Sequence, residues 1–501
     1  MFLRLFEILP AFLAWSTLLL PFVLIHYAPV AVAIFLMLYV FMWFLRAIEF
    51  GYFLVYSYIQ YKKVLSTRWE EKAKMLPKTD IRIEDVIHLI IIPTYKESGE
   101  VLEESIHTIA SANYDQKKII VCLATEERDA ERGRKNAAFL QKKYAHVFRD
   151  FWWVEHPKNL PHEIAGKGAN ITYAGRQCAQ NIRKANIPLH HVLVTTLDAD
   201  NKIHNDLLWC LSIAYVQEPE RHKRSFQPIP LFFNNIWQVP VLNRIVALSS
   251  GYWHMIESGR PDRLRNFSSH SQPLTALVEM DFWDVTTIVE DGRQYWRSYL
   301  HFFGDYEVIP VFLPIYQDAI MSSTLFRSLV GQFQQLRRWA WGASDIAYFA
   351  DGIRKHWKKL PKGKTLLQFF RLVEGHYMWA TAALFLSIAT PSLRFLWEDF
   401  SESVLGNHIA LILSTLFHIA LFGICISIVL TFFVLPAPPK KSQRIGLLFQ
   451  WILFPVVTIC FGTFPALVAQ TQLALGQKMK FNVTEKVVKK KRSCIHTTNI
   501  L

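Results

Sequence analysis

The chain has 501 residues, of which 51% are hydrophobic and 14% aromatic, and its formal net charge is +14. Because the apolar residues are clustered, the composition excludes the one or two purely soluble domains that the length alone would suggest. Nucleic-acid binding is the weaker interpretation of the charge, since no basic motif stands on a fold that reads bases. The six cysteines are scattered without CxxC spacing, which argues against a disulfide framework or a zinc site.

The first apolar block predicts two membrane helices. No Asp, Glu, Lys or Arg occurs from Ile8 to Leu45, and a spanning helix needs about 20 mostly apolar residues. This run is too long for one helix, and it is interrupted at Pro21 and near Pro29. We therefore expect one helix near residues 9–27 and a second near residues 30–57.

The long polar region that follows alternates short apolar runs with helix-like stretches. The apolar runs are rich in β-branched residues and predict buried strands of a mostly parallel sheet. These runs are VIHLIII at 86–92, KKIIVCLA at 117–124 and HHVLVTTL at 190–197. The helix candidates between them are residues 100–112, 128–145 and 168–186. This alternation predicts an α/β domain.

Polar residues follow each of the three predicted strands. In open α/β sheets ligands bind outside the carboxyl ends of the strands, so we expect these side chains to line one crevice. Ordinary strand-to-helix turns capped by Asp and Thr are the alternative for any one strand, but a weaker one for all three in order. The residues are Thr94, Tyr95, Glu97, Glu126, Asp198 and Asp200.

Two acidic pairs have the chemistry of a catalytic site. Asp198 and Asp200 form D-x-D after a predicted strand, and Mg²⁺ or Mn²⁺ often binds through one or two carboxylates plus substrate phosphates. Farther along, Glu290 and Asp291 follow the apolar run DFWDVTTIV. Adjacent acids are usually solvated surface, but the apolar run favours a placed carboxylate that serves as a general base.

Gln335, Arg338 and Trp339 form the motif Q-x-x-R-W. On a helix, positions i and i+3 share a face, so Gln335 and Arg338 are expected to project together. The planar fork of an arginine suits a diphosphate, and an indole suits the face of a sugar ring. An amphipathic helix on the membrane surface is the alternative interpretation, and both can hold at once.

Taken in order, these motifs resemble those of membrane-embedded family 2 glycosyltransferases, which include the cellulose, chitin and hyaluronan synthases. The shared set is an apolar strand into P-x-Y-x-E, then D-x-D, an E-D pair and Q-x-x-R-W, over about residues 85–345 and both membrane blocks. The resemblance implies a GT-A-type nucleotide-sugar-binding domain inserted between N- and C-terminal transmembrane helices. The implied parts are two transmembrane helices at 1–58, a cytoplasmic catalytic domain at 59–350, an interfacial segment at 351–370, three or four transmembrane helices at 371–477, and a cytoplasmic tail at 478–501.

The resemblance also implies a role for each matching residue. Asp200 would hold Mg²⁺ or Mn²⁺, Asp291 would deprotonate the acceptor hydroxyl, and Trp339 would contact the acceptor sugar. Lys167 and Asn170, in GKGAN, resemble the family's lysine-containing donor loop. The nucleotide-sugar donor, with a UDP-sugar favoured, would be bound by Thr94, Tyr95, Glu97, Glu126, Lys167, Asn170, Asp198, Gln335 and Arg338.

The chain departs from the family pattern at several positions. Lys96 stands where Asn is common, and the sequence TEE leaves the choice between Glu126 and Glu127 open. The segment 267–283 lacks the small-residue acceptor loop of the family, which puts the acceptor most in doubt. His301, in LHFFG, is expected to be structural rather than catalytic.

The hexapeptide FNVTEK near the end of the chain matches the F-x-V-T-x-K gating loop of processive members. The matching residues are Phe481, Val483, Thr484 and Lys486. By composition alone this segment is a solvated tail, whereas the resemblance implies a loop that closes over the bound nucleotide and excludes water. The tail must then lie on the same side of the membrane as the catalytic domain.

Charge asymmetry predicts the topology. The loop after the second helix is basic, which places the catalytic domain and the N-terminus in the cytoplasm, at a plasma (inner) membrane. Further helices are expected near 372–391 and 408–435. The last apolar stretch, 445–477, has two prolines and a glycine in its middle, so we expect a hairpin of two short helices that returns the tail to the cytoplasm. A single long tilted helix is the alternative.

Three functions compete on this sequence. The leading one is an inverting, metal-dependent hexosyltransferase that elongates a polysaccharide and passes it across the membrane. The second is transfer of a single sugar to a lipid or lipid-linked acceptor. The third is a catalytically silent membrane channel or binding protein, against which Asp200, Asp291 and Arg338 argue. The residues leave the sugar, the linkage, the acceptor and any accessory subunit open.

Overall fold

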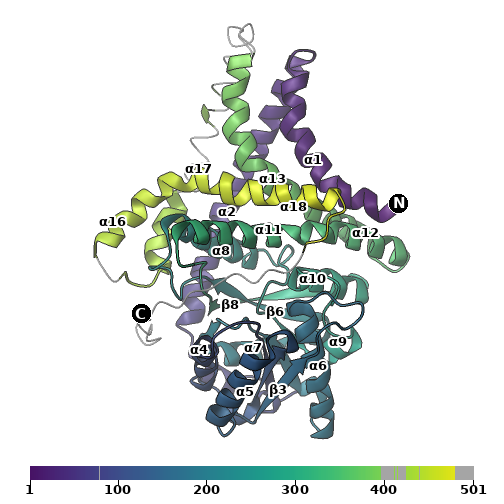
Figure 1. Ribbon diagram of the computed structural model, residues 1–501, viewed down its shortest axis with the longest axis vertical. Coiled ribbons are helices and arrows are strands. Elements are labelled where there is room, and N and C mark those ends of the chain that lie inside the picture. Colours follow the sequence, from purple (N-terminus) through teal and green to yellow (C-terminus); the bar gives the residue numbers. More distant parts are fainter. Residues whose placement is uncertain (78, 397–410, 412–413, 416–424, 439–440, 480–501) are drawn as a thin grey trace.

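The structure, a computed structural model, describes residues 1–77, 79–396, 411, 414–415, 425–438 and 441–479. An α/β domain forms one end of the molecule, and long helices project away from it at the other end (Figure 1). Within the described residues, three helices are long and apolar enough to cross a membrane, which is consistent with a membrane protein. They are Phe2–Leu24, Pro29–Leu65 and Gln443–Ala474.

The N-terminal block contains the two expected helices, α1 (Phe2–Leu24) and α2 (Pro29–Leu65). Helix α2 begins with Pro29, a residue tolerated in the first turn because its missing N–H has no partner there. The helix extends beyond the expected 30–57, because its last turns pack on the α/β domain and bury Tyr61.

The sheet has eight strands in the order β3-β2-β1-β4-β7-β6-β8-β5. Strands β3, β2, β1 and β4 are parallel, as are β6 and β8, whereas β7 is antiparallel to both β4 and β6, and β5 is antiparallel to β8. The sheet is therefore mixed, and the expected parallel arrangement describes only its first half. The strands are β1 (Ile87–Pro93), β2 (Ile119–Glu126), β3 (Asp150–His156), β4 (Val192–Thr196), β5 (Lys202–Ile203), β6 (Arg224–Leu231), β7 (Ser271–Pro273) and β8 (Glu307–Tyr316).

Strand β1 shows why its sequence is a continuous apolar run. Successive side chains of a strand point to opposite faces, and both faces of β1 are covered. Ile90 and Ile92 lie in one core cluster with helices α4, α5 and α7, whereas Leu89 and Ile91 lie in the opposite cluster with α6. These helices are α4 (Gly99–Ala110), α5 (Ala130–Tyr144), α6 (Lys167–Lys184) and α7 (Leu207–Gln217).

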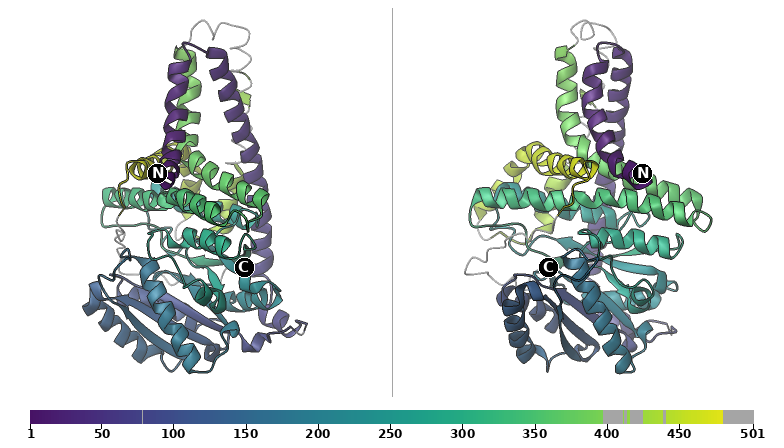
Figure 2. Two further views of the ribbon diagram at one scale, coloured as in Figure 1. Left: turned by 90° about the vertical axis from the view of Figure 1, so that its right-hand side faces the viewer. Right: turned by 45° about the vertical axis from the view of Figure 1, so that its right-hand side comes forward.

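The second half of the domain is mainly helical and lies between the sheet and the projecting helices (Figures 1 and 2). The buried Arg293 of α10 ties two elements to it, since it donates to Asp345 of α12 at 2.5 Å and to Asp284 at 3.0 Å. The helices not yet given are α3 (Trp69–Lys74), α8 (Val241–Ser258), α9 (Leu274–Glu279), α10 (Glu290–His301), α11 (Leu325–Ala340) and α12 (Ser344–His356).

After α12 the chain leaves the domain and returns to it. Helix α13 (Lys362–Leu396) rises beside α1 and α2 (Figure 2). The helical segment Cys425–Val434 lies against α8, where Tyr252 donates a hydrogen bond to Thr431 at 2.7 Å. Half of the helix expected at 408–435 lies outside the described residues. The positions of α13 and of Cys425–Val434 show that the chain leaves the α/β domain and comes back to it.

The last apolar stretch does not form the expected hairpin. It is one irregular helix, Gln443–Ala474. This helix contains most of α16 (Lys441–Gln450), followed by α17 (Phe454–Val457), a π-helical turn and α18 (Phe464–Ala474). Pro455 and Pro465 each stand in the first turn of a helical segment, where a missing N–H costs little, so they interrupt the hydrogen bonding without reversing the chain. This helix runs across the bundle of α1 and α13 rather than along it (Figures 1 and 2).

Candidate active site

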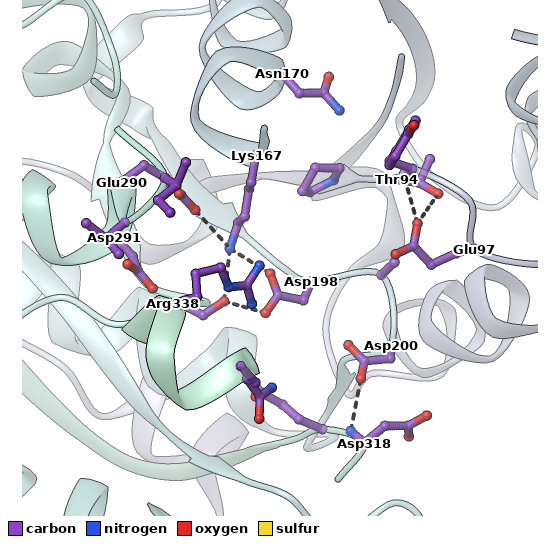
Figure 3. Close-up of a pocket in the computed structure, with 18 of the residues that line it drawn as sticks. Thr94, Glu97, Lys167, Asn170, Asp198, Asp200, Glu290, Asp291, Asp318 and Arg338 are labelled. Atoms are coloured by element: carbon purple, nitrogen blue, oxygen red, sulfur yellow. Dashed lines mark hydrogen bonds and ion pairs between the residues drawn. The ribbon is translucent and has the colours of Figure 1, made fainter. Parts of the chain in front are cut away.

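The predicted site residues within the described chain come together in one pocket outside the carboxyl ends of β1, β2 and β4. Figure 3 shows acidic and basic side chains from the sheet, from α10 and from α11 converging on it. The gating-loop residues Phe481, Val483, Thr484 and Lys486 lie outside the described residues. Those that line the pocket are Thr94, Tyr95, Glu97, Glu126, Lys167, Asn170, Asp198, Asp200, Asp291, Gln335, Arg338 and Trp339.

The turn after β1 is held by Glu97. Its carboxylate accepts hydrogen bonds from the Thr94 hydroxyl at 2.9 Å and from the Tyr95 backbone N–H at 2.6 Å. Lys96, which lies between Tyr95 and Glu97, has a φ of 72°. This left-handed conformation costs a residue other than glycine roughly 1–2 kcal/mol, and Asn adopts it more readily. Asp129 stabilises this conformation by accepting from the Lys96 N–H at 3.0 Å. The departure from Asn to Lys therefore falls on a strained turn.

Glu126, rather than Glu127, faces the pocket. Arg128 donates to its carboxylate at 2.7 Å and also stacks over the Tyr95 ring at 4.4 Å. Burial raises the pKa of Glu126, and Arg128 opposes that rise. Glu127 instead accepts from the backbone N–H of Lys158 at 2.9 Å on the protein surface. Of the two acids between which the sequence left the choice open, Glu126 is the one that lines the pocket.

Lys167 is the cation at the centre of the pocket, between Asp198 and Glu290 (Figure 3). Its ammonium group donates to Asp198 Oδ1 at 2.6 Å and to the Ser268 hydroxyl at 2.9 Å, and lies 3.8 Å from Glu290 Oε1. Burial alone would lower its pKa, but Asp198, Glu290 and Asp291 together raise it, so Lys167 is charged. A second anion, such as a diphosphate, would meet a fixed ammonium here.

Helix α6 begins at Lys167 and approaches α10 very closely. A Cβ on Gly168 would lie 2.7 Å from the Asp284 carbonyl oxygen and 3.0 Å from Glu290 Cβ, which explains the glycine in GKGAN. Two residues farther on, the amide of Asn170 donates to the Ala124 carbonyl at 2.9 Å. Asn170 therefore lines the pocket and also fixes the end of β2 to α6.

Asp200 is oriented by a residue that the sequence reading missed. The backbone N–H of Asp318 donates to Asp200 Oδ2 at 3.0 Å (Figure 3), and the buried Asp318 side chain also lines the pocket. Asp318 is the second residue after β8, so the rule of polar residues after a strand would have found it had β8 been predicted. The amide of Asn234 donates to the Asp200 carbonyl at 3.0 Å and fixes the same turn.

A divalent metal fits this corner only with help from a substrate. Among the described residues, no group of three or more His, Cys, Asp or Glu side chains is arranged to hold a metal ion. Carboxylate oxygens are the ligands that Mg²⁺ and Mn²⁺ prefer, and an ion held by one or two carboxylates completes its coordination with substrate phosphates and water. Asp200 fits that kind of site.

Glu290 and Asp291 open helix α10, where the helix dipole favours negative charge. The buried Glu290 has its pKa raised to about 7 by burial first and by Asp291 second, against the opposing Lys167. Asp291 is less buried, and its carboxylate accepts from the Gly292 N–H at 2.8 Å. Two adjacent carboxyl groups thus have different environments, and only Glu290 is buried.

The Q-x-x-R-W motif lies in the last turns of α11. Thr324 caps the N-terminus of this helix by accepting a hydrogen bond from the Arg327 N–H at 3.2 Å. Gln335 accepts a hydrogen bond from the Gln332 amide at 3.0 Å. The ring of Trp339 packs on Phe232 with the ring centroids 6.0 Å apart. The motif therefore brings an amide, a guanidinium and an indole to the side of the pocket that faces the projecting helices.

Two further predictions concern the segment 267–283 and His301. In that segment Ser268 lines the pocket and donates to Asp198 Oδ2 at 2.5 Å, a role that nothing in the sequence pattern indicated. His301 lies away from the pocket and pairs with Glu279 at 2.8 Å, as expected of a structural residue.

No protein-family model matches the chain, and no curated protein matches it. Among solved structures, it is similar to the mannosyltransferase PcManGT from Pyrobaculum calidifontis in complex with GDP-Man and Mn²⁺, at 15% identity and a TM-score of 0.42, over 88% of this chain and 100% of that one. It is also similar to S. aureus TarS 1-349 in complex with UDP-GlcNAc, at 12% identity and a TM-score of 0.32, over 79% and 94%. A third similar structure is GalNAc-T7 with UDP, GalNAc and Mn²⁺, at 9% identity and a TM-score of 0.33, over 58% of this chain and 58% of that one. At such TM-scores the likeness decides nothing about this chain, whose function is argued below from its own site.

Proposed function

We propose that this protein is an inverting, metal-dependent glycosyltransferase that uses a nucleotide-diphosphate sugar, with a UDP-sugar favoured. The observation that carries the proposal is the convergence of Lys167, Asp200, Asp291 and Arg338 on one pocket at the carboxyl ends of parallel strands. The pocket thus holds two cations for a diphosphate, a carboxylate for a metal and another for a base.

The donor binds across the strand ends. Thr94, Tyr95 and Glu97 form the turn nearest the nucleotide, with Glu126 beside them, and Asp198 contacts the nucleotide between that turn and Lys167. Gln335 and Arg338 hold the diphosphate from the opposite side, since a guanidinium matches phosphate oxygens with two parallel hydrogen bonds. Lys167 has to exchange part of its contact with Asp198 for the donor.

A Mg²⁺ or Mn²⁺ ion, when bound by Asp200 and the donor diphosphate, supplies positive charge to the leaving group. The residues of the chain do the rest. Asp291 accepts the proton of the acceptor hydroxyl, and the freed oxygen forms a bond to the anomeric carbon. The bond from that carbon to the diphosphate oxygen breaks, and its electron pair leaves with the nucleoside diphosphate, whose charge Arg338 and Lys167 stabilise. One displacement inverts the anomeric configuration.

The acceptor approaches from the side of Trp339, which faces the projecting helices. We propose elongation of a polysaccharide at, and across, the membrane, since FNVTEK resembles the gating loop of processive enzymes. Helix α13 leads away from the α/β domain, and the segment Cys425–Val434 lies beside that domain again. The helix Gln443–Ala474 lies across α1 and α13. We propose two crossings after the catalytic domain, one by α13 and one by a helix that ends with Cys425–Val434, which would return the tail to the cytoplasmic side without a hairpin.

Transfer of a single sugar to a lipid acceptor is the second candidate. Exposed apolar side chains at the start of α11, Leu325 and Phe326, favour a membrane-embedded acceptor that reaches the pocket along this helix. The enzyme and its catalytic domain belong, on either proposal, at a plasma (inner) membrane with both termini in the cytoplasm.

Product sizing separates these functions. Purified full-length protein in liposomes is incubated with labelled nucleotide sugars and Mg²⁺ or Mn²⁺, and both nucleoside diphosphate release and product length are measured. Long products support the polymerase, and one-sugar lipid products support the second candidate. If no common nucleotide sugar yields a nucleoside diphosphate with either metal, both proposed functions are contradicted.

A further inference from the structure

A basic surface segment connects α12 to α13, close to the N-terminus and at the foot of the projecting helices (Figure 1). The sequence from Gly352 to Val373 contains no Asp or Glu. The mechanism proposed above uses none of its residues. Its exposed cations are Arg354, Lys355, Lys358, Lys359, Lys362 and Lys364.

Some of these cations are neutralised within the protein. Asp351 pairs with Arg354 at 2.7 Å and with Lys355 at 2.6 Å. Lys364 lies 3.4 Å from Glu307. These contacts account for three of the exposed cations, and Asp262 pairs with the less exposed Arg371 at 2.7 Å. The remaining lysines therefore have to be considered separately.

Lys358, Lys359 and Lys362 form no ion pair with any residue in the described part of the chain. Two of them instead lie over aromatic rings, Lys359 over Phe303 at 4.7 Å and Lys362 over Trp357 at 5.7 Å. Three exposed ammonium groups within residues 358–362 and without an acidic partner repel one another, so an external anion would be stabilised here.

Apolar side chains flank the same lysines. On the first turns of α13, Leu366, Leu367 and Phe370 are 52%, 48% and 64% exposed. The other face of these turns is anchored, since Thr365 is hydrogen bonded to Tyr299 at 3.0 Å. Cationic groups beside exposed leucine and phenylalanine are typical of an element at the membrane interface.

The N-terminal turn of α1 extends this apolar rim. Phe2, Leu3 and Leu5 are exposed, and the guanidinium of Arg354 lies 5.3 Å from the Phe2 ring. A soluble anion or a nucleic acid would need no such rim.

We propose that this basic platform, formed by Lys358, Lys359 and Lys362 with Leu366, Leu367 and Phe370, binds anionic phospholipids. One or two of the three ammonium groups hold each headgroup phosphate, and the acyl chains lie against the apolar side chains. This inference does not depend on the proposed glycosyl transfer.

The platform is joined rigidly to the helix that carries Glu290 and Asp291. Besides the contact of Thr365 with Tyr299, Gly304 packs so tightly on Pro361 that a Cβ would lie 2.5 Å from Pro361 Cδ. Gly304 also has a φ of +89°, which favours glycine. Lipid bound at the platform therefore fixes the height of α10 above the membrane surface.

A matched pair of triple variants tests the proposal. The first carries Lys358→Gln, Lys359→Gln and Lys362→Gln. The control carries Lys135→Gln, Lys142→Gln and Lys184→Gln, which remove equal charge from exposed positions on α5 and α6 at the far end of the domain (Figure 1). Full-length protein in a neutral detergent is titrated with dioctanoyl phosphatidylglycerol, dioctanoyl phosphatidylcholine, inorganic phosphate or a single-stranded oligonucleotide, and the shift in unfolding temperature gives the affinity.

Wild type and control should bind phosphatidylglycerol equally and phosphatidylcholine much more weakly. Each lysine near an anionic lipid surface contributes about 1 kcal/mol, and one headgroup engages one or two of them, so the platform variant should bind about tenfold more weakly. A second variant, Leu366→Ser with Leu367→Ser, keeps the charge and should also weaken phosphatidylglycerol binding. Equal lipid binding by both triple variants, or no lipid binding by wild type, overturns the proposal. Lysine-dependent binding of phosphate as tight as that of the lipid, or of the oligonucleotide in place of it, overturns it as well.

Discussion

The two sides of the pocket differ in how they are built. The donor side consists of turns after strands β1, β2 and β4, where each polar residue follows a buried run of β-branched residues. The side that faces the projecting helices comes from α10 and α11, which are held by long-range contacts such as Arg293 with Asp345. The proposed donor side is therefore built from local turns, whereas the position of Asp291, the proposed base, depends on how several helices pack. The variants below separate these two sides.

The largest effect is expected from Asp291→Asn on the helical side. The amide cannot accept the acceptor proton, and general-base catalysis contributes about 10²–10⁴-fold, so transfer should fall by about that factor while donor affinity stays nearly unchanged. Turnover with saturating donor and donor binding are measured separately. The exposed Asp305→Asn serves as the matched control and should leave both unchanged. Turnover retained by the Asp291 variant would sink the assignment of the base.

Arg338→Lys tests the cation that α11 adds to the donor side. A lysine keeps the charge but loses the two-pronged contact with a diphosphate, and removal of one donor to a developing charge costs about 10²–10³-fold in turnover. We expect a loss at the lower end of that range, with weaker binding of the nucleoside diphosphate product. Arg327→Lys, at an exposed position on the same helix, is the control. Equal effects of both variants would mean that Arg338 only supports the helix.

The same contrast explains what the sequence predicts. The sequence predicts β1, β2 and β4 with bounds that differ from the structure by only a few residues. A β-branched run that is buried on both faces has a local signature, and the predicted runs are 86–92, 117–124 and 190–197. Strand β7 was missed because Ser271–Pro273 has no such run and pairs only through tertiary contacts. Because β8 was not predicted, Asp318 was not recognised either. A polar residue after a strand can be recognised only when the strand itself is predicted.

The helix Gln443–Ala474 was misjudged for another reason. Its composition is that of a membrane span, but composition does not fix how an apolar helix is oriented. Here packing decides: Gln470 donates to the His376 carbonyl of α13 at 2.8 Å, and Arg4 of α1 caps the end of α18 by donating to the Ala474 carbonyl at 2.7 Å. Such contacts cannot be read from the sequence of either helix alone.

Gly168→Ala probes the contact between the two sides. The added Cβ would lie 2.7 Å from the Asp284 carbonyl oxygen, so α6 or α10 has to shift, and overpacking of this kind costs about 1–3 kcal/mol. The unfolding temperature should fall, and turnover should fall more than donor affinity because α10 carries Asp291. Gly363→Ala is the control, since no atom lies within 4 Å of its added Cβ. Matching unfolding temperatures for the two variants would show that the contact is loose.

Glu290→Gln should have the smallest effect, visible as a change with pH. Burial and Asp291 raise the pKa of Glu290 from 4.5 to about 7, so the folded protein holds this proton more tightly than the unfolded chain. The resulting stabilisation is complete below pH 4.5 and is lost as the pH rises to about 7. Since glutamine does not ionise, the unfolding temperature of Glu290→Gln, taken relative to wild type in the same detergent, should increase from pH 5 to pH 8. The exposed Glu131→Gln should show no such trend. Parallel curves for Glu290→Gln and wild type would mean that Lys167 keeps Glu290 ionised throughout and that the pKa of Glu290 is not raised.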